Sequence, residues 1–158
     1  MTEHRGEICF PGGRIEHEES VIEAALRETE EEIGLPVDKV EIWGEMTACF
    51  TRSRSHTVTP VLGKISDSVC LSDLTPHVAE VDNIFTLPIA ELIAPENLAY
   101  TQFRFKGGPG YSIPVFRVKN RRIWGLTGLI LHMALKALLP ESGTTLFRPK
   151  LKFVKSVI

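Results

Sequence analysis

The feature that most constrains this chain is a predicted helix with capping residues at both of its ends. Ser20 is followed three residues later by Glu23, which is the spacing of a capping box. Gly34 suits the left-handed position just past a helix end, and Pro36 cannot continue the helix. The sequence therefore predicts a helix over residues 21–33. The side chains that recur at helical spacing and would pack on a sheet are Ile22, Ala25, Leu26, Thr29 and Ile33.

The third turn of this helix carries a cluster of acidic side chains. Residues three and four apart are neighbours on a helix, so Glu28, Glu31 and Glu32 project toward one patch. Like charges at this spacing destabilise a helix by about 0.2–0.5 kcal/mol per pair, which predicts a bound cation. Mg²⁺ and Mn²⁺ prefer carboxylate oxygens and keep waters that phosphate oxygens can replace. Arg27 lies four residues before Glu31 and can orient it by an ion pair. The alternative is a solvated helix face, which is what most glutamate runs are.

The spacing around the helix favours the metal-binding interpretation. The segment 13–35 resembles the Nudix box, in which glycine, glutamate, arginine and aliphatic residues stand at fixed distances. On that resemblance the chain is identified as a member of the Nudix hydrolase family, with Thr29 in place of a bulky aliphatic residue. The positions that match the box are Gly13, Glu19, Arg27, Glu28, Glu31, Glu32, Gly34 and Leu35.

A second resemblance narrows the family to its coenzyme A diphosphatase branch. Residues 6–13 read Gly-x3-Phe-Pro-Gly-Gly, which is similar to the end of the additional signature of that branch. The similarity covers about residues 5–139 and includes an animal mitochondrial member. Further segments that resemble this branch are residues 57–61, 80–88, 100–101 and 123–128.

The resemblance implies an α/β fold, namely the Nudix α/β/α sandwich with a mixed central sheet. It places the Nudix hydrolase domain at residues 1–140 and a C-terminal tail at residues 141–158. Nudix proteins generally have strands before the box, yet only twelve residues precede Gly13. We therefore expect the first strands of the sheet to be missing. Three interpretations of the tail stay open, namely a final strand, a membrane-surface patch and a frayed end.

The same resemblance implies the reaction and the roles of the site residues. It implies hydrolysis of the diphosphate linkage of coenzyme A or acyl-CoA to 3′,5′-ADP and 4′-phosphopantetheine or its acylated form, with Mg²⁺ or Mn²⁺ as cofactor. Nudix enzymes recruit the general base from different loops, and Glu80 is our choice, with Glu31 as the alternative. The expected ligands of the metal are Glu28, Glu31 and Glu32; the expected catalytic residues are Arg27, Glu31 and Glu80; and the expected substrate-binding residues are Gly12, Gly13 and Arg5.

Two other functions remain compatible with the sequence. One is hydrolysis of a different nucleoside diphosphate derivative, such as ADP-ribose or NADH. The other is a non-catalytic, truncated Nudix fragment whose box is intact but whose substrate pocket is incomplete. An ordered sheet beside converging carboxylates would favour the enzyme.

Composition sets limits on partners and location. With 43% hydrophobic and 24% charged residues the chain resembles a single soluble domain, and a net charge of −2 makes nucleic acid an unfavourable partner. An anionic substrate must then be attracted by the metal and by local cations, for which Arg52, Arg54, Arg121 and Arg122 are candidates, although ordinary surface arginines explain each one equally well. The oligomeric state is left open.

Cysteine usage and hydropathy add two exclusions. Three cysteines without CxxC spacing indicate neither a disulfide framework nor a zinc site. The longest apolar run, residues 130–139, is interrupted by His132 and Lys136 and is too short for a bilayer, so no integral membrane association is expected. The family resemblance implies a mitochondrial location, with the cytosol as the alternative, since no targeting segment is recognisable.

The remaining secondary structure is predicted from the alternation of apolar and polar residues and from residues typical of turns. Lys119 and Asn120 predict a tight turn between two strands, and the apolar spacing of residues 127–139 predicts a second helix. A glycine-rich connection is expected at residues 107–110. The expected extended segments are residues 7–10, 39–50, 57–65, 83–87, 112–118 and 121–124, with a polar turn at residues 51–55.

Overall fold

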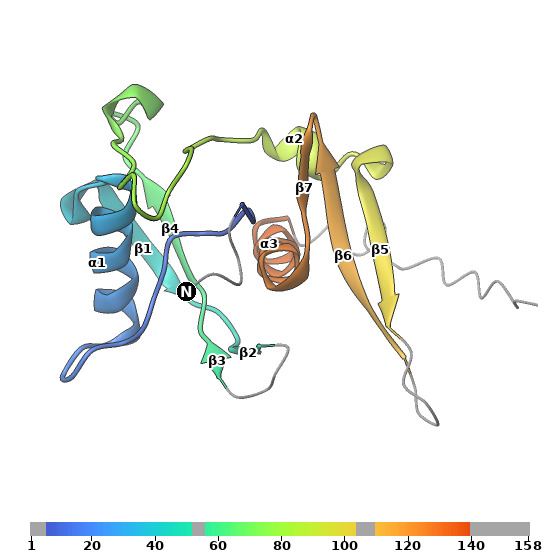
Figure 1. Ribbon diagram of the computed structural model, residues 1–158, viewed down its shortest axis with the longest axis horizontal. Coiled ribbons are helices and arrows are strands. Elements are labelled where there is room, and N and C mark those ends of the chain that lie inside the picture. The colour runs from blue at the N-terminus through green and yellow to red at the C-terminus, as the bar shows by residue number, and fades with distance from the viewer. Residues whose placement is uncertain (1–5, 52–55, 104–109, 140–158) are drawn as a thin grey trace, which may run out of the picture. The chain divides into compact units, whose positions relative to one another are not determined.

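The computed structural model describes residues 6–51, 56–103 and 110–139 (Figure 1). The chain forms two compact units, residues 1–88 and residues 89–158, and each is described by itself. Helices and antiparallel strands occur in both units, so the predicted α/β class is confirmed. The ladders within the described residues are all antiparallel, and the parallel pairing of a mixed sheet is not among them.

The first unit is built around one long helix and a two-stranded ladder. The helix α1 (Val21–Ile33) contacts both β1 (Val40–Glu45) and β4 (Val61–Ile65), which pair antiparallel (Figure 1). A register shift between Ile42 and Gly44 interrupts that ladder. The shorter elements of the unit are the 3-10 turns η1 (Val37–Lys39) and η2 (Leu71–Asp73) and the paired strands β2 (Cys49–Phe50) and β3 (Thr57–Val58).

The predicted boundaries of α1 are confirmed. The backbone N–H of Glu23 donates to the Ser20 hydroxyl at 3.2 Å, and the N–H of Ser20 donates to the Glu23 carboxylate at 2.8 Å. These two bonds satisfy donors that a helix start leaves open. At the other end Gly34 has φ +67° and its N–H donates to the carbonyl of Glu30. Of the helix and its flank, Ala24 and Leu35 are buried, whereas the predicted stripe is half-buried.

A later segment of the first unit closes the C-terminal end of α1. The N–H of Thr75 donates to the carbonyl of Ile33 at 3.0 Å, and the N–H of His77 donates to the carbonyl of Glu32 at 2.8 Å. Both carbonyls belong to the last turn, where no intrahelical partner exists. We call residues 75–81 the brace, because these bonds tie them to the helix end that carries the acidic cluster.

The second unit is a three-stranded sheet with a helix against it. Its sheet order is β5 (Leu98–Phe103), β6 (Tyr111–Val118) and β7 (Arg121–Ile123), all antiparallel. The helix α3 (Gly125–Leu138) packs on β6, and a Cβ at Gly128 would lie 2.7 Å from the carbonyl of Pro114, so the two backbones approach closely (Figure 1). Preceding the sheet are the short helix α2 (Ile89–Leu92) and the turn η3 (Pro95–Asn97). The buried core of this unit comprises Leu92, Val115, Phe116, Val118, Ile123, Leu131 and Leu135.

Several local predictions differ from the structure. Residues 83–87 were expected to form a strand, but they are irregular. Residues 7–10, which were expected to be extended, pair with no other strand among the described residues. The expected hairpin of residues 39–50 and 57–65 is split into two ladders, since Pro60 has no N–H to donate at the break. The strand β5 was not predicted. The turn at Lys119 and Asn120 and the second helix are confirmed.

Some predictions fall largely on residues outside the described ranges. Of the polar turn at residues 51–55, which includes Arg52 and Arg54, the structure describes Thr51 alone. Of the glycine-rich connection at residues 107–110, the structure describes only Gly110. The tail at residues 141–158 lies outside the described ranges.

We expect Gly34→Ala to destabilise the first unit. A Cβ at this position would meet the backbone N and O of Thr75 at 3.2 Å, and the left-handed conformation itself costs a non-glycine residue about 1–2 kcal/mol. Gly125→Ala is the matched control, because Gly125 has φ +64° and open space around its Cβ position. Thermal unfolding should show the larger loss for Gly34→Ala. Equal losses would mean that contact with the brace contributes nothing.

Candidate functional site

The site is organised by one arginine on α1. The guanidinium of Arg27 binds Glu19 through two nitrogens, with Nε to Oε1 at 2.8 Å and Nη2 to Oε2 at 3.0 Å. Its Nη1 donates to Glu28 Oε1 at 3.1 Å and to Glu31 Oε2 at 3.3 Å. Nη2 also donates to the carbonyl of Arg14. Arg27 therefore ties the loop before the helix to two glutamates of the acidic cluster, and the predicted pair with Glu31 is present.

Partial burial strengthens this arrangement. The side chains of Arg27, Glu19 and Glu28 are 24%, 13% and 16% exposed, whereas that of Glu31 is 61% exposed. Hydrogen bonding to Arg27 is the main reason that the pKa of Glu19 lies below its ordinary value, and the same bond raises the pKa of Arg27. The pair with Glu19 is thus the firm one, and the exposed pair with Glu31 is the weaker one.

Gly13 leaves the space in which the Glu28 carboxylate lies. A Cβ built on Gly13 would overlap both the carboxyl carbon and the oxygens of Glu28. The glycine that begins the box is therefore required here for close approach. The predicted role of Gly13 in substrate binding stays a prediction.

Glu32 experiences the concentration of negative charge most strongly. Its pKa is raised, first by burial, then by the charge of Glu28, with smaller contributions from Glu80 and Glu31. The backbone N–H of Gly12 donates to the Glu32 carboxylate and opposes the shift. The charges of Glu28, Glu80 and Glu31 thus raise the cost of ionising Glu32, and a cation beside Glu32 would lower that cost.

The donor set fits a divalent cation by its chemistry and charge. Carboxylate oxygens are the ligands that Mg²⁺ and Mn²⁺ prefer. Across the described ranges, no three acidic, histidine or cysteine side chains are already gathered around one point at ligand distance. Arg27 holds Glu28 and Glu31 in its own hydrogen bonds. Binding a cation would therefore require these two carboxylates to turn from the guanidinium toward Glu32.

Glu80 reaches this site through the brace. Its N–H donates to the carbonyl of His77 at 2.9 Å, and its carboxylate lies 3.8 Å from Nδ1 of the same histidine. The charge of Glu80 is felt at Glu32, which places it in the same electrostatic neighbourhood. Of the other predicted residues, Arg5 lies outside the described ranges.

Sequence reasoning missed two neighbours of the acidic cluster. The brace residues Thr75 and His77 bind through backbone amides, so no side-chain pattern announces them. Cys9 is the other, and the pKa of its thiol is raised by burial and then by the charges of Glu32 and Glu7. Its position shortly before the glycine pair was the signal that could have revealed it.

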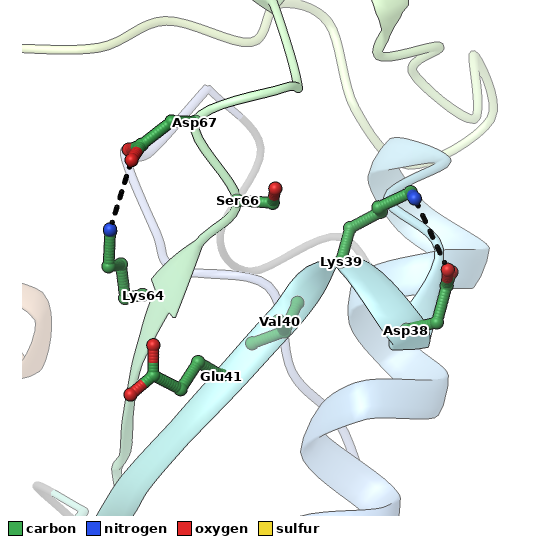
Figure 2. A pocket seen from close by; sticks show the side chains of 7 residues that line it. All are labelled: Asp38, Lys39, Val40, Glu41, Lys64, Ser66 and Asp67. Atoms are coloured by element: carbon green, nitrogen blue, oxygen red, sulfur yellow. Dashed lines mark hydrogen bonds and ion pairs between the residues drawn. The ribbon is translucent and has the colours of Figure 1, made fainter.

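A concave region of the first unit lies away from the box residues. Figure 2 shows it between the start of β1 and the end of β4. Four of its charged side chains form two ion pairs, Lys39 with Asp38 at 3.3 Å and Lys64 with Asp67 at 3.2 Å, and Glu41 is the remaining charge on its lining. No glutamate of the box lines it, so it is not the candidate site.

Comparison with known proteins decides the family. A family model described as NUDIX domain matches residues 2–106. The chain belongs to the Nudix family. It is 41% identical to Nudix hydrolase 3 of Caenorhabditis elegans over 89% of this chain and 64% of that protein. Identity to the mitochondrial coenzyme A diphosphatase NUDT8 is 40% for the Mus musculus protein and 38% for the Homo sapiens protein.

The region shared with these relatives covers most of this chain but a smaller fraction of each relative. The two NUDT8 matches cover 87% and 94% of this chain, and 65% and 61% of the mouse and human proteins. The chain thus spans less than two thirds of the length of these three relatives. The family predicted from the box is confirmed. In addition, no helix in the described part of the chain is long and apolar enough to cross a membrane.

We expect Gly13→Ala to be destabilising in the native background and nearly neutral in a Glu28→Ala background. The added methyl group overlaps the Glu28 carboxylate, and such overpacking costs about 1–3 kcal/mol. Removing that carboxylate frees the space. Thermal or urea unfolding of the two single variants and the double variant measures the coupling. Strictly additive effects would contradict the close approach.

We expect Glu19→Gln to remove stability chiefly at neutral pH. The folded-state pKa of Glu19 is depressed, so its contribution is present above the ordinary value of 4.5 and disappears as pH falls through the folded-state pKa. The gap in unfolding free energy between the native protein and the variant should therefore narrow below pH 4.5. Glu18→Gln is the control, because that side chain is 86% exposed and is not among the carboxylates that pair with Arg27 in the described residues. A gap that is constant with pH would contradict the assignment.

Proposed function

We propose that this chain is a metal-dependent diphosphatase acting on coenzyme A or acyl-CoA, with 3′,5′-ADP and 4′-phosphopantetheine or its acylated form as products. The observation that carries the proposal is the acidic cluster of Glu28, Glu31 and Glu32, joined by Glu80, beside the Gly12–Gly13 backbone. Similarity to proteins named coenzyme A diphosphatase supports the substrate class. A mitochondrial location is part of the proposal, on the same similarity.

In this proposal Glu28, Glu31 and Glu32 hold Mg²⁺ or Mn²⁺. The bound metal would neutralise phosphate charge and lower the pKa of a water ligand. Before a metal binds, Arg27 holds Glu28 and Glu31 through its Nη1, and the firm pair with Glu19 would keep the guanidinium in place when these two carboxylates turn toward the metal. Gly12 and Gly13 let the backbone lie against the carboxylates, and with Arg5 we assign them to substrate binding.

We assign the general base to Glu80 in preference to Glu31. A base must accept the proton of the attacking water, and an ion pair with a guanidinium weakens that ability. Glu31 accepts such a bond from Arg27, whereas the nearest recorded partner of Glu80 is His77 at 3.8 Å. The brace also holds the backbone before Glu80 against the end of α1.

The test is hydrolysis of coenzyme A, ADP-ribose and NADH by the full chain in Mg²⁺ and in Mn²⁺. We expect coenzyme A to be the preferred substrate, and Glu32→Gln to lower kcat by about a hundredfold or more, as loss of a group that stabilises transition-state charge does. Glu30→Gln is the matched control, because Glu30 is exposed on the same helix and outside the cluster.

Two results would contradict the proposal. Equal kcat values for Glu32→Gln and Glu30→Gln would remove the acidic cluster from the reaction. A folded native chain that hydrolyses none of the three substrates would be the non-catalytic fragment, and preference for ADP-ribose or NADH would replace the substrate class.

A further inference from the structure

The guanidinium of Arg27 and a divalent cation would bind the same two carboxylates of the first unit. Nη1 of Arg27 donates to Glu28 Oε1 at 3.1 Å and to Glu31 Oε2 at 3.3 Å. These two glutamates are, with Glu32, the proposed ligands of the metal. Among the described residues, Arg27 is the one cationic side chain paired with any of the three. A cation that binds Glu28 and Glu31 must therefore share them with the guanidinium or displace it.

Sharing does not remove the conflict between the two cations. Each carboxylate has a second oxygen, which could accept a metal ion while the first oxygen keeps its bond to Nη1. The guanidinium would still repel the metal ion and would still draw negative charge from the carboxylate. The side chains of Arg27 and Glu28 are only 24% and 16% exposed, so water screens this repulsion less than it does at an open surface. Either arrangement lowers the affinity for the metal.

Glu19 determines how much of the Arg27 charge acts on the cluster. It binds the guanidinium at two points, with Nε to Oε1 at 2.8 Å and Nη2 to Oε2 at 3.0 Å. Its side chain is 13% exposed, and it precedes the helix that carries the proposed ligands. Glu19 neutralises much of the charge of Arg27 without being a proposed ligand itself. Loss of this carboxylate would leave Glu28 and Glu31 as the recorded acidic partners of Arg27 among the described residues.

We propose that Arg27 is an internal counter-ion that competes with the divalent cation for Glu28 and Glu31, and that Glu19 limits this competition. The identity of the cation rests on the proposed function, whereas the competition rests on the hydrogen bonds of Arg27. The alternative is that Arg27 only preorganises the two carboxylates for the metal. The two views predict opposite signs for the effect of Arg27 on metal affinity.

The first measurement is calorimetric binding of Mn²⁺ alone to the full chain, which is independent of turnover. We expect Arg27→Gln to lower the Kd for Mn²⁺ by about three- to tenfold, because ion pairs of this exposure no longer oppose binding. Lys64→Gln is the matched control, since it removes the same charge from the same unit, in the concave region that no glutamate of the box lines. It should change the Kd by less than about twofold. An unchanged or raised Kd for Arg27→Gln would overturn the proposal.

Glu19→Gln should have the opposite effect. We expect it to raise the Kd for Mn²⁺ by about three- to tenfold, because the charge of Arg27 then acts on Glu28 and Glu31 without compensation. Glu18→Gln makes the same change in net charge at the neighbouring position, where the side chain is 86% exposed and is not among the recorded partners of Arg27. Equal Kd values for these two variants would remove Glu19 from the proposal.

Thermal unfolding provides a second readout and shows whether each variant is folded. With a chelator present, Arg27→Gln should melt at a lower temperature than the native chain, because it lacks three ion pairs. Saturating Mn²⁺ should raise the Tm of this variant more than that of the native chain, since tighter binding gives a larger stabilisation. If Arg27→Gln is unfolded in the chelator, Mn²⁺ should refold it by supplying the missing counter-charge. A variant that stays unfolded in Mn²⁺ would contradict the competition.

The outcomes separate this proposal from the proposed function. If the native chain hydrolyses coenzyme A and Arg27→Gln binds Mn²⁺ more weakly, the competition is wrong and the function stands. If Arg27→Gln binds Mn²⁺ more tightly but the native chain hydrolyses none of the three substrates, the competition stands and the function is wrong. If the native chain binds neither Mn²⁺ nor Mg²⁺, both are wrong.

Discussion

The arrangement of the acidic site depends on the guanidinium of Arg27. Within residues 6–51, 56–103 and 110–139 it is the one cation paired with carboxylates of the box, and it binds three of them together with a backbone carbonyl. Its two-point contact with Glu19 connects the loop before α1 to the middle of the helix. Without Arg27, the charges of Glu28 and Glu31 would be unneutralised, and the loop before α1 would lose its ion pair with the helix. The helix can carry several acids on one face because Arg27 neutralises part of their charge, and in the proposed function a metal ion neutralises the rest.

Closure of the helix ends is the second condition for the site. The capping box at Ser20 begins α1 at a defined residue, and the left-handed Gly34 ends it. The brace then occupies carbonyls of the last turn, one of which belongs to Glu32 itself. A single backbone bond thus joins a proposed metal ligand to the segment that carries Glu80. Residues far apart in sequence become neighbours through main-chain atoms, and this contact does not use the carboxylates of Glu32 and Glu80.

The sequence predicted the parts of this protein that depend on local rules. Capping residues, the glycine past the helix end and the spacing of the glutamates are written in consecutive positions, so α1 and its pair between Arg27 and Glu31 could be predicted. The β6–β7 turn at Lys119 and Asn120 is equally local. The strand β5 and the brace could not be predicted in this way, because a strand needs a partner and the brace binds through amides that every residue possesses. Residues 83–87 were wrongly predicted as a strand. Their residue pattern is typical of a strand, but they pair with no strand among the described residues.

The two units carry opposite charge, with a formal net charge of −10 for residues 1–88 and +8 for residues 89–158. This difference has a consequence for the protein in solution. A net charge of −2 would by itself indicate weak forces between molecules. Yet the acidic residues of one molecule can attract the basic residues of the β6–β7 hairpin, residues 117–122, of another. Such attraction acts over the Debye length, which is about 30 Å at 0.01 M salt and about 8 Å at physiological ionic strength. Colloidal behaviour should therefore follow ionic strength more than pH near neutrality. Dilute buffer would bring molecules together, and salt would disperse them.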